Sequence, residues 1–275
     1  MKKFIYAISA LAVMMAVGCS KEDVETPSPE YKLVVNMDKP SFGDDTRAVR
    51  TSWENGDVVY VVFDGDLYDG ATVAKYLTLT YNGSSWTSTW VGTNAAEVAA
   101  KETKTLCAVY VNTPVTPDFW NNGQNLSFES ATQGVYTMTC EDGTYTVSDS
   151  IITLNIALEH ECSQITVRGI DVAGNWTLSC NRLQALLGAG VSNSNGAGVS
   201  AGNFNDSLTG FANADGVSFY GYYPGATSPS NLTFTLTNGT KTYTRTFTDK
   251  GGIKYGMAII MDGPSSGKWT EVVEE

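Results

Sequence analysis

Short runs of β-branched and aromatic residues recur along the whole chain, separated by glycine, asparagine, aspartate and proline. Such runs at short intervals are typical of an antiparallel β-sandwich. We expect strands at residues 31–37, 57–63, 104–111, 151–158 and 163–170. The one stretch with helical character, residues 94–102, would make about two turns. A parallel α/β enzyme scaffold is therefore disfavoured, and the sequence predicts an all-β fold.

Two segments have the alternation of a β-hairpin. One flanks Asn82-Gly83 within residues 76–90, and the other flanks Asn238-Gly239 within residues 231–248. Asn-Gly is the dipeptide that tolerates positive φ in a two-residue type I′ turn. In both hairpins Leu, Phe or Trp alternates with Thr, so each should cover a core with one face and meet water with the other.

One such hairpin in each half predicts two domains of related build in tandem. We place the boundary within residues 145–150, which end in the turn residues 148–150, and this gives an N-terminal β-sandwich domain at 31–149 and a C-terminal one at 150–275. Residues 188–206 are rich in Gly, Asn and Ser and have no periodicity. They are expected to form a mobile surface loop of the second domain.

The N-terminus has the pattern of a bacterial lipoprotein signal peptide. Lys2 and Lys3 precede an apolar run at residues 4–17 that is too short to span a bilayer, and Gly18 stands before Cys19. We expect residues 1–18 to be removed and Cys19 to be lipidated. An ordinary secretory signal that contains a cysteine is the alternative, because the leucine preferred three residues before the cysteine is missing.

The residues after Cys19 suggest where the protein is delivered. Lys21, Glu22 and Asp23 resemble the signal that moves lipoproteins of some Gram-negative anaerobes to the outer face of the outer membrane. The alternative is a charged, solvated start of the tether. Residues 19–30 would then form a lipidated tether, extended by Pro27 and Pro29.

The charge balance excludes one class of partner. Loss of residues 1–18 removes Lys2 and Lys3 and changes the formal net charge from −12 to −14. Binding to phosphates requires a basic footprint, so nucleic acid is not expected as a partner. The acidity fits a soluble, self-repelling exterior.

The sequence contains no recognisable motif of a catalytic, metal or cofactor site. The lone histidine, His160, stands between two glutamates and is expected to form a hydrogen bond across the sandwich. There is no GxSxG or Walker motif; a hydrolase survives as an alternative because catalytic carboxylates have no fixed spacing. The acidic run Asp64 to Asp69 lacks the later glutamate of a calcium loop and is expected to be an ordinary turn. Four cysteines are expected to be buried free thiols, although an exported chain permits three disulfide pairings: Cys107, Cys140, Cys162 and Cys180.

Tryptophans on strands could form platforms for sugar, but aromatics in alternating strands more often lie in a core. The candidates are Trp86, Trp90, Trp120 and Trp176. Trp53, which precedes a turn at Gly56, is expected to close one end of the first core.

A series of modest motifs, in this order and spacing, resembles the fimbrillins, which are lipoprotein-derived subunits of type V pili and their tip and anchor relatives. The motifs lie at Thr46-Arg47, residues 51–58, 76–79, 154–167, 221–224 and 251–255, and at Trp269.

The resemblance implies transthyretin-like, Greek-key β-sandwich domains and a non-enzymatic role in adhesion. It also implies assembly by strand exchange, in which a protease cuts after Arg47 or Arg50, residues 31–37 leave, and a neighbour's strand enters; residues 269–273 would belong to the donated segment. Expected partners are the outer membrane through the lipid, other fimbrial subunits or a second copy, and a host protein or glycan. The role as stalk, tip or anchor stays open, and the alternative is a monomeric lipoprotein that binds carbohydrate or a host ligand.

Two serines resemble bacterial O-glycosylation sites, in which an acidic residue precedes a hydroxyl residue and an apolar residue follows it. They are Ser150, between Asp149 and Ile151, and Ser207, between Asp206 and Leu208. The pattern is only three residues long, so it arises often by chance.

Overall fold

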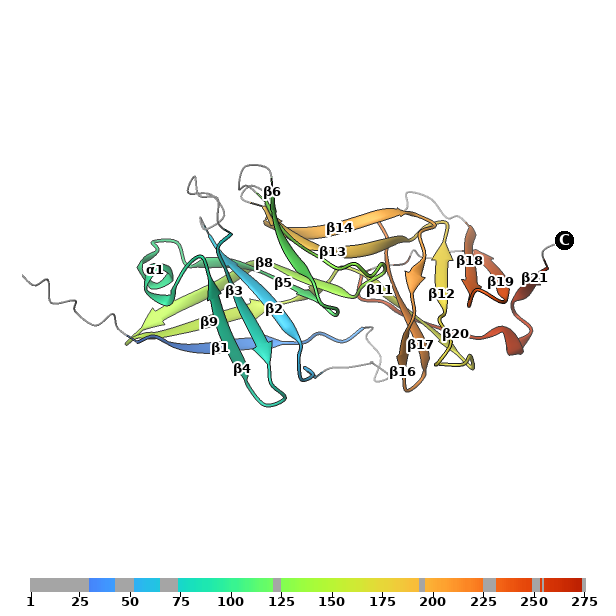
Figure 1. The fold of residues 1–275 in the computed structure, drawn as a ribbon, viewed down its shortest axis with the longest axis horizontal. Coiled ribbons are helices and arrows are strands. Elements are labelled where there is room, and N and C mark those ends of the chain that lie inside the picture. The colour runs from blue at the N-terminus through green and yellow to red at the C-terminus, as the bar shows by residue number, and fades with distance from the viewer. Residues whose placement is uncertain are drawn as a thin grey trace, which may run out of the picture.

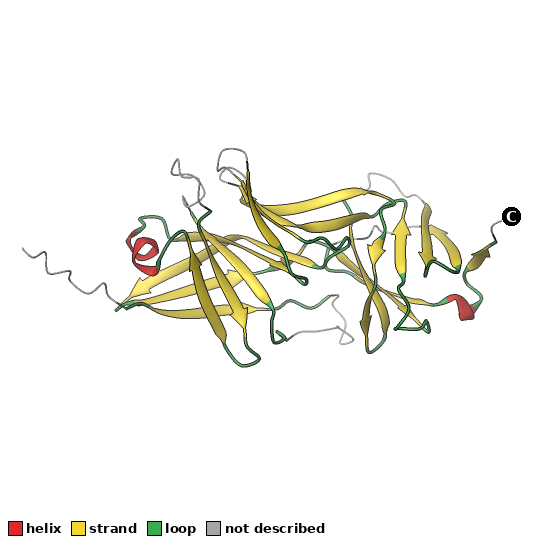
Figure 2. Cartoon of the chain, viewed as in Figure 1, coloured by secondary structure: helices red, strands yellow, loops and turns green. Residues whose placement is uncertain are grey.

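The computed structural model describes residues 30–42, 52–64, 74–120, 125–192, 196–224, 231–248, 253 and 255–273. In these ranges the chain is built almost entirely of strands, so the predicted all-β sandwich fold is confirmed (Figures 1 and 2). The predicted helix is present as α1 (Ala95–Ala100), where the Asn94 side chain accepts a hydrogen bond from the Glu97 N–H at 3.0 Å. No helix in the described ranges is long and apolar enough to cross a bilayer.

The first sheet forms one end of an elongated molecule (Figure 1). Its strands lie in the order β1-β9-β8-β5-β2-β3-β4, with β10 beside β8. β1 runs parallel to β9, whereas the other pairs are antiparallel. The strands are β1 (Lys32–Asp38), β2 (Val58–Phe63), β3 (Tyr76–Tyr81), β4 (Trp86–Val91), β5 (Thr105–Val111), β8 (Thr137–Ser148), β9 (Ile151–Ala157) and β10 (Glu159–His160).

The second and third sheets form the rest of the molecule. The second has the order β20-β11-β17-β13-β7-β6, with β14 beside β13 and β16 beside β17; the third has the order β15-β12-β18-β19-β21. The second sheet contains β6 (Thr116–Trp120), β7 (Asn125–Glu129), β11 (Ser163–Arg168), β13 (Gln184–Ser192), β14 (Gly196–Phe204), β16 (Phe211–Asn213), β17 (Gly216–Tyr222) and β20 (Ala258–Asp262). The third contains β12 (Thr177–Cys180), β15 (Leu208–Thr209), β18 (Asn231–Thr237), β19 (Thr242–Thr248) and β21 (Thr270–Val272).

Alternating apolar residues build three buried clusters. In the first, one face of the first sheet closes around side chains such as Phe63, Leu77 and Leu154. In the second, the second and third sheets face each other across side chains such as Phe219 and Phe234. In the third, β7, β13 and β14 cover the other face of β2 and β5. The central strands β2 and β5 are therefore buried on both faces.

Both predicted Asn-Gly hairpins are present, but the predicted turn type is wrong. Tyr81 pairs with Trp86 and Thr237 pairs with Thr242, so each loop has four residues instead of two. Only the glycine of each Asn-Gly has positive φ. The Asn82 side chain accepts hydrogen bonds from the N–H groups of Ser84 and Ser85, and this local capping favours the longer loop.

The expected mobile loop at 188–206 is also wrong, because β13 and β14 form a long hairpin there, with residues 193–195 outside the description. A Cβ on Gly188 would come within 2.0 Å of the Phe128 carbonyl oxygen of β7. Close approach of β13 to β7 thus selects glycine. The same glycines remove the hydrophobic alternation from the sequence.

Strand pairing indicates where the first sheet ends along the chain, and hence where a boundary between two domains can lie. The boundary placed between residues 149 and 150 falls in the turn that joins β8 to β9, and β9 stays in the first sheet. β6 and β7, from the N-terminal half, pair into the second sheet. The sheets change at residues 161–162, where β10 ends and β11 follows. We propose the boundary between two domains at that point.

Candidate functional site

β1 is an edge strand of the first sheet. It pairs with β9, and among the described residues no strand lies along its other side. The alternation of its sequence turns Leu33, Val35 and Met37 onto the first core, while Asn36 and Asp38 face solvent. Its removal would break one parallel ladder and uncover part of the core, but it would leave the antiparallel pairs of the sheet intact.

Lys39 continues the inward row of β1. Pro40 follows it and favours an extended conformation at Lys39, so the lysine side chain enters the protein two residues after Met37. That side chain is 2% exposed. Its ammonium lies 2.8 Å from Asp57 Oδ2, donates to the Tyr110 hydroxyl at 3.2 Å, and lies 4.8 Å and 4.6 Å from the ring centres of Trp53 and Tyr110. A buried lysine requires such compensation.

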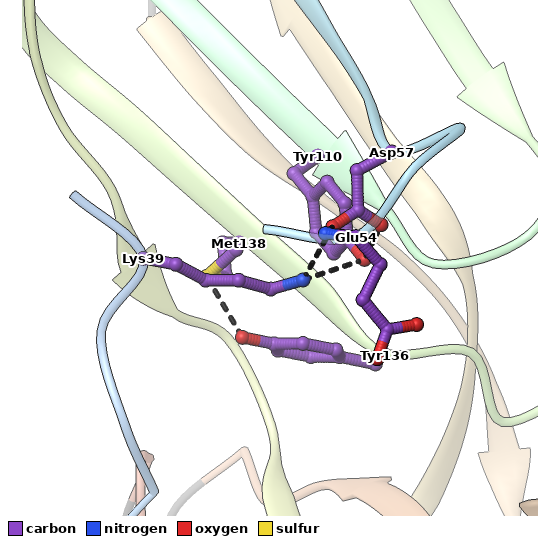
Figure 3. Close-up of polar contacts among 6 residues, drawn as sticks. All are labelled: Lys39, Glu54, Asp57, Tyr110, Tyr136 and Met138. Carbon is purple, nitrogen blue, oxygen red and sulfur yellow. Dashed lines mark hydrogen bonds and ion pairs between the residues drawn. The ribbon is translucent and has the colours of Figure 1, made fainter. Parts of the chain in front are cut away.

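Asp57 holds this arrangement from the start of β2. Its Oδ1 accepts a hydrogen bond from the Tyr110 hydroxyl at 2.8 Å, and its Oδ2 accepts one from the Glu54 N–H at 2.8 Å as well as the lysine. Figure 3 shows the Lys39 ammonium directed between Asp57 and Tyr110. The carboxylate therefore joins the turn before β2, the end of β5 and the segment after β1.

Phe42 makes the second buried contact after β1. Its ring stacks on His160 with a centroid distance of 3.9 Å and packs on Tyr136 at 5.0 Å. Tyr136 in turn stacks on Tyr220 of β17 at 5.2 Å. We call Lys39 and Phe42, with their contact residues Trp53, Asp57, Tyr110 and His160, the β1 anchor.

The hydrogen bond expected from His160 is not formed. Neither ring nitrogen makes a hydrogen bond of good geometry among the described residues, although the Pro40 and Ser41 backbone lies close enough to favour the protonated ring. The ring contributes by stacking on Phe42. Burial lowers the pKa of His160; the nearby Lys39 ammonium also lowers it, while the backbone of Ser41 and Pro40 raises it. His160 is therefore a neutral packing group at pH 7.

A cavity of about 490 Å³ lies beside the β1 anchor, between the first and second sheets. Besides anchor residues, its lining includes Asn112, Tyr136, Gln164, Phe211, Asn213 and Tyr220. Burial raises the pKa of the Tyr136 hydroxyl far above its ordinary value, so that hydroxyl stays protonated. The cavity can offer aromatic faces, neutral polar groups and the charged groups of Lys39, Glu54 and Asp57. Among the described lining residues, no nucleophile is paired with a base.

Most predicted site residues lie outside the described ranges: Cys19, Lys21, Glu22, Asp23, Arg47 and Arg50. Arg47 and Arg50 come five and eight residues after Phe42 in the sequence. Ser150 and Ser207 are described and exposed, and so are accessible to modifying enzymes. Asp64 follows the end of β2 and is the last described residue before a gap, and Asp69 lies outside the description. The described residues contain no cluster of metal-ligating side chains.

The predicted structural roles of other side chains can be compared directly. Trp53 packs edge-on against Trp86 at 4.9 Å and closes the first core as predicted. Trp86 and Trp90 pack against the first core and Trp176 is buried in the second, while the Trp120 side chain lies outside the description. All four described cysteines are free thiols, with Cys107 half-buried and the others buried.

The segment expected to be donated begins at a well-anchored residue. Trp269 is buried in the second cluster, and its indole N–H donates to the Asp262 carbonyl oxygen at 2.8 Å. β21 follows it and pairs with β19 at the edge of the third sheet, with its three side chains exposed. Its release would therefore require little loss of buried surface beyond Trp269.

No protein-family model matches the sequence, and no curated protein matches it. Solved structures with a related arrangement include a fimbrial protein of Bacteroides ovatus (13% identity, 86% of this chain, 49% of that chain, TM-score 0.42). Another is a candidate cell adhesion protein of Bacteroides thetaiotaomicron (12% identity, 84% of this chain, 90% of that chain, TM-score 0.39). A third is the tip fimbrial protein Mfa3 of Porphyromonas gingivalis (14% identity, 72% of this chain, 78% of that chain, TM-score 0.28). The chain spans about half the length of the first.

Proposed function

We propose that this protein is a surface-exposed lipoprotein that serves as a structural or accessory subunit of a fimbrium in cell adhesion and acts without catalysis. The proposal starts from the sequence motifs that resemble fimbrillins. The structural observation that supports it is the position of β1, an edge strand whose inward residues cover the core and whose outer edge is unpaired among the described residues.

Strand exchange would use this position. If β1 left, the edge of β9 would present unpaired backbone groups, and the sites of Leu33, Val35 and Met37 would be empty. An incoming strand would regain the ladder hydrogen bonds and the apolar burial together. Cleavage after Arg47 or Arg50 is the proposed trigger, because both arginines follow β1 in the chain and precede β2.

Size-exclusion chromatography after mild arginine-directed proteolysis tests this proposal. Cleavage should release the N-terminal strand and convert monomers into detergent-resistant oligomers. The double variant Arg47→Ala with Arg50→Ala should fold normally, stay uncut in this segment and remain monomeric. A cleaved wild type that stays monomeric and keeps its N-terminal strand would contradict assembly by exchange.

A second candidate is a monomeric lipoprotein that binds a glycan or another host ligand. The cavity beside the β1 anchor favours it, because stacked Tyr136 and Tyr220 rings stand next to the Asn112 and Asn213 side chains there. Aromatic faces with a few polar groups are typical of small-ligand sites. Binding of the intact monomer on a glycan array, abolished by Tyr220→Ala, would support this candidate over the first.

Lipid attachment and surface export are part of the proposal. Cys19→Ala should abolish fatty-acid labelling and release the protein from membranes. Replacing Lys21, Glu22 and Asp23 by Ala should leave the protein on the membrane but protect it from protease added to intact cells. Continued labelling of the first variant, or digestion of the second, would contradict the respective step.

Glycosylation at Ser150 and Ser207 is proposed from the sequence pattern, and both serines have the exposure that it requires. Intact-mass measurement of the native protein should show added sugar that is lost in the variants Ser150→Ala and Ser207→Ala. A measured mass equal to that of the lipidated polypeptide alone would contradict glycosylation at both serines.

A further inference from the structure

The inward row of β1 carries a pattern more specific than apolar alternation. Leu33, Val35 and Met37 contact the first core, and the next inward position is Lys39 instead of a fourth apolar residue. The ammonium of Lys39 is enclosed by Asp57, the Tyr110 hydroxyl and the rings of Trp53 and Tyr110. The site under β1 therefore accepts three apolar side chains followed by one cation.

We propose that the groove under β1 selects an incoming strand with this same pattern, three alternate apolar residues and then lysine or arginine, and that it rejects the C-terminal segment of this chain. The inference rests on the proposed exchange of β1. It identifies the donor as a strand of another polypeptide that carries this pattern, and it excludes residues 269–275 of a second copy.

Departure of β1 would leave the cation-binding groups in place. Asp57 precedes β2, and Tyr110 belongs to β5, so both stay with the body of the first sheet. Their mutual hydrogen bond of 2.8 Å and the Glu54 N–H hold the carboxylate in position without the lysine. A carboxylate largely removed from water requires a partner charge, so an apolar residue in the place of Lys39 would be disfavoured, and a glutamate more so.

The C-terminal segment does not offer the pattern in either register. One face of residues 269–275 would present Trp269, Glu271, Val273 and Glu275, and the other would present Thr270, Val272 and Glu274. Neither face has three successive apolar side chains, and both contain glutamate. The one nearby cation, Lys268, precedes these residues instead of following a row of apolar side chains. Entry of this segment would place a negative charge against the groove instead of a cation.

Peptide competition on the cleaved mature chain tests the inference. A fluorescent peptide of residues 30–42 is exchanged into the groove at the urea concentration that releases half of the native N-terminal segment. Competing peptides are residues 30–42 as wild type, Lys39→Arg, Lys39→Met and Lys39→Glu, and the equally long segment 263–275. Because urea releases the native segment, the ranking is obtained whether or not that segment leaves in buffer.

The wild-type and Lys39→Arg peptides should compete within about tenfold of each other, and the Lys39→Met peptide should be about a hundredfold weaker than wild type. The Lys39→Glu peptide and segment 263–275 should be weaker still. In the protein variant Asp57→Asn, the preference for Lys39 over Met should fall to a few-fold, since the buried charge is gone.

Equal competition by the wild-type and Lys39→Met peptides, or competition by segment 263–275 at the wild-type level, would overturn the inference. Failure of the proposed function is a different observation: the native segment stays bound in buffer and no oligomers form, while the peptide ranking in urea is unaffected.

Discussion

The Lys39 ammonium and the Asp57 carboxylate lie 2.8 Å apart in the interior, where the lysine side chain is 2% exposed and the aspartate side chain is 13% exposed. This ion pair connects the segment after β1, an edge strand, with the start of β2, which is buried on both faces. Transfer of two charges from water offsets much of their attraction, so such a pair contributes little net stability, but removal of one partner is costly. The ion pair instead fixes the register of β1, because a slip by one residue would turn Lys39 to the other face of the sheet.

The ion pair predicts the effect of substitutions in the intact chain. Lys39→Ala should lower the free energy of unfolding by about 3 kcal/mol, because it leaves the Asp57 carboxylate buried without its counter-charge. Lys32→Ala is the matched control, since Lys32 is exposed on the same strand and its loss should cost less than about 0.5 kcal/mol. Urea denaturation followed by tryptophan fluorescence measures both, and similar losses for the two variants would show that the pair has no special role.

His160 predicts a pH dependence. Burial lowers its pKa below the unfolded value of 6.5, so the folded state disfavours the protonated ring. The stabilising effect of the neutral ring is therefore fully present above pH 6.5 and is lost as the pH falls toward the lowered folded pKa, where the unfolded state binds more protons. Wild type should lose stability between pH 7.5 and 5.5 relative to its own value at pH 7.5, and His160→Gln should lose less.

Comparison with His160→Gln isolates the histidine from a neighbouring carboxyl. Burial raises the pKa of Glu161, a shift that favours the folded state at low pH and so acts in the opposite direction. That contribution is common to wild type and variant. Parallel stability curves for the two chains between pH 7.5 and 5.5 would show that burial beside the Phe42 ring does not lower the pKa of His160.

The positions of the strands could be predicted because alternation and turn residues are local properties. Residues 31–37, 57–63 and 151–158 were expected as strands and are found within one residue of those limits as β1, β2 and β9. The turn type at Asn82-Gly83 could not be predicted from the dipeptide, because side-chain capping of Ser84 and Ser85 competes with the two-residue turn. The β13–β14 hairpin was missed because the glycines that allow close packing on β7 carry no hydrophobic signal.

The β1 anchor could not be predicted from the sequence for a different reason. A lysine after an amphipathic strand ordinarily marks the end of burial. Lys39 is buried because it binds Asp57 and Tyr110, which lie 18 and 71 positions away in the chain. A usable signal was nevertheless present. Lys39 stands in the same alternation as Leu33, Val35 and Met37, so an inward lysine, and hence a buried acidic partner, could have been expected.

The cysteines should be poorly reactive in the folded protein. Burial raises the pKa of Cys162 to about 12 and that of Cys107 and Cys180 to about 11, and it also raises the pKa of Cys140. The thiolate is the reactive form, so little of it exists at pH 8. We expect iodoacetamide at pH 8 to label Cys107 first, because it is half-buried, and the others only on unfolding. Peptide mapping by mass spectrometry reads each site, and rapid labelling of Cys162 in the native state would contradict its burial.

The turn between β8 and β9 offers a stabilising substitution. Asp149 and Ser150 have φ values of 48° and 63°, and Ser148 pairs with Ile151, so this is the two-residue turn with positive φ at both positions that was expected at Asn-Gly. A side chain in this region is strained, and glycine is not. Ser150→Gly should therefore raise the free energy of unfolding by about 0.5 to 1 kcal/mol, after the entropy cost of glycine.

The same substitution two residues earlier, at the end of β8, is the control for that gain. Ser148 lies in β8 outside the positive-φ region, so Ser148→Gly should lower stability by about 0.5 to 1 kcal/mol. The Ser150 carbonyl oxygen accepts the Lys32 N–H at 2.9 Å, and this contact to the start of β1 is kept in Ser150→Gly because it uses only backbone atoms. Urea denaturation of unglycosylated protein should thus move the two midpoints in opposite directions. A loss in both variants would mean that the Ser150 side chain makes a stabilising contact that outweighs its backbone strain.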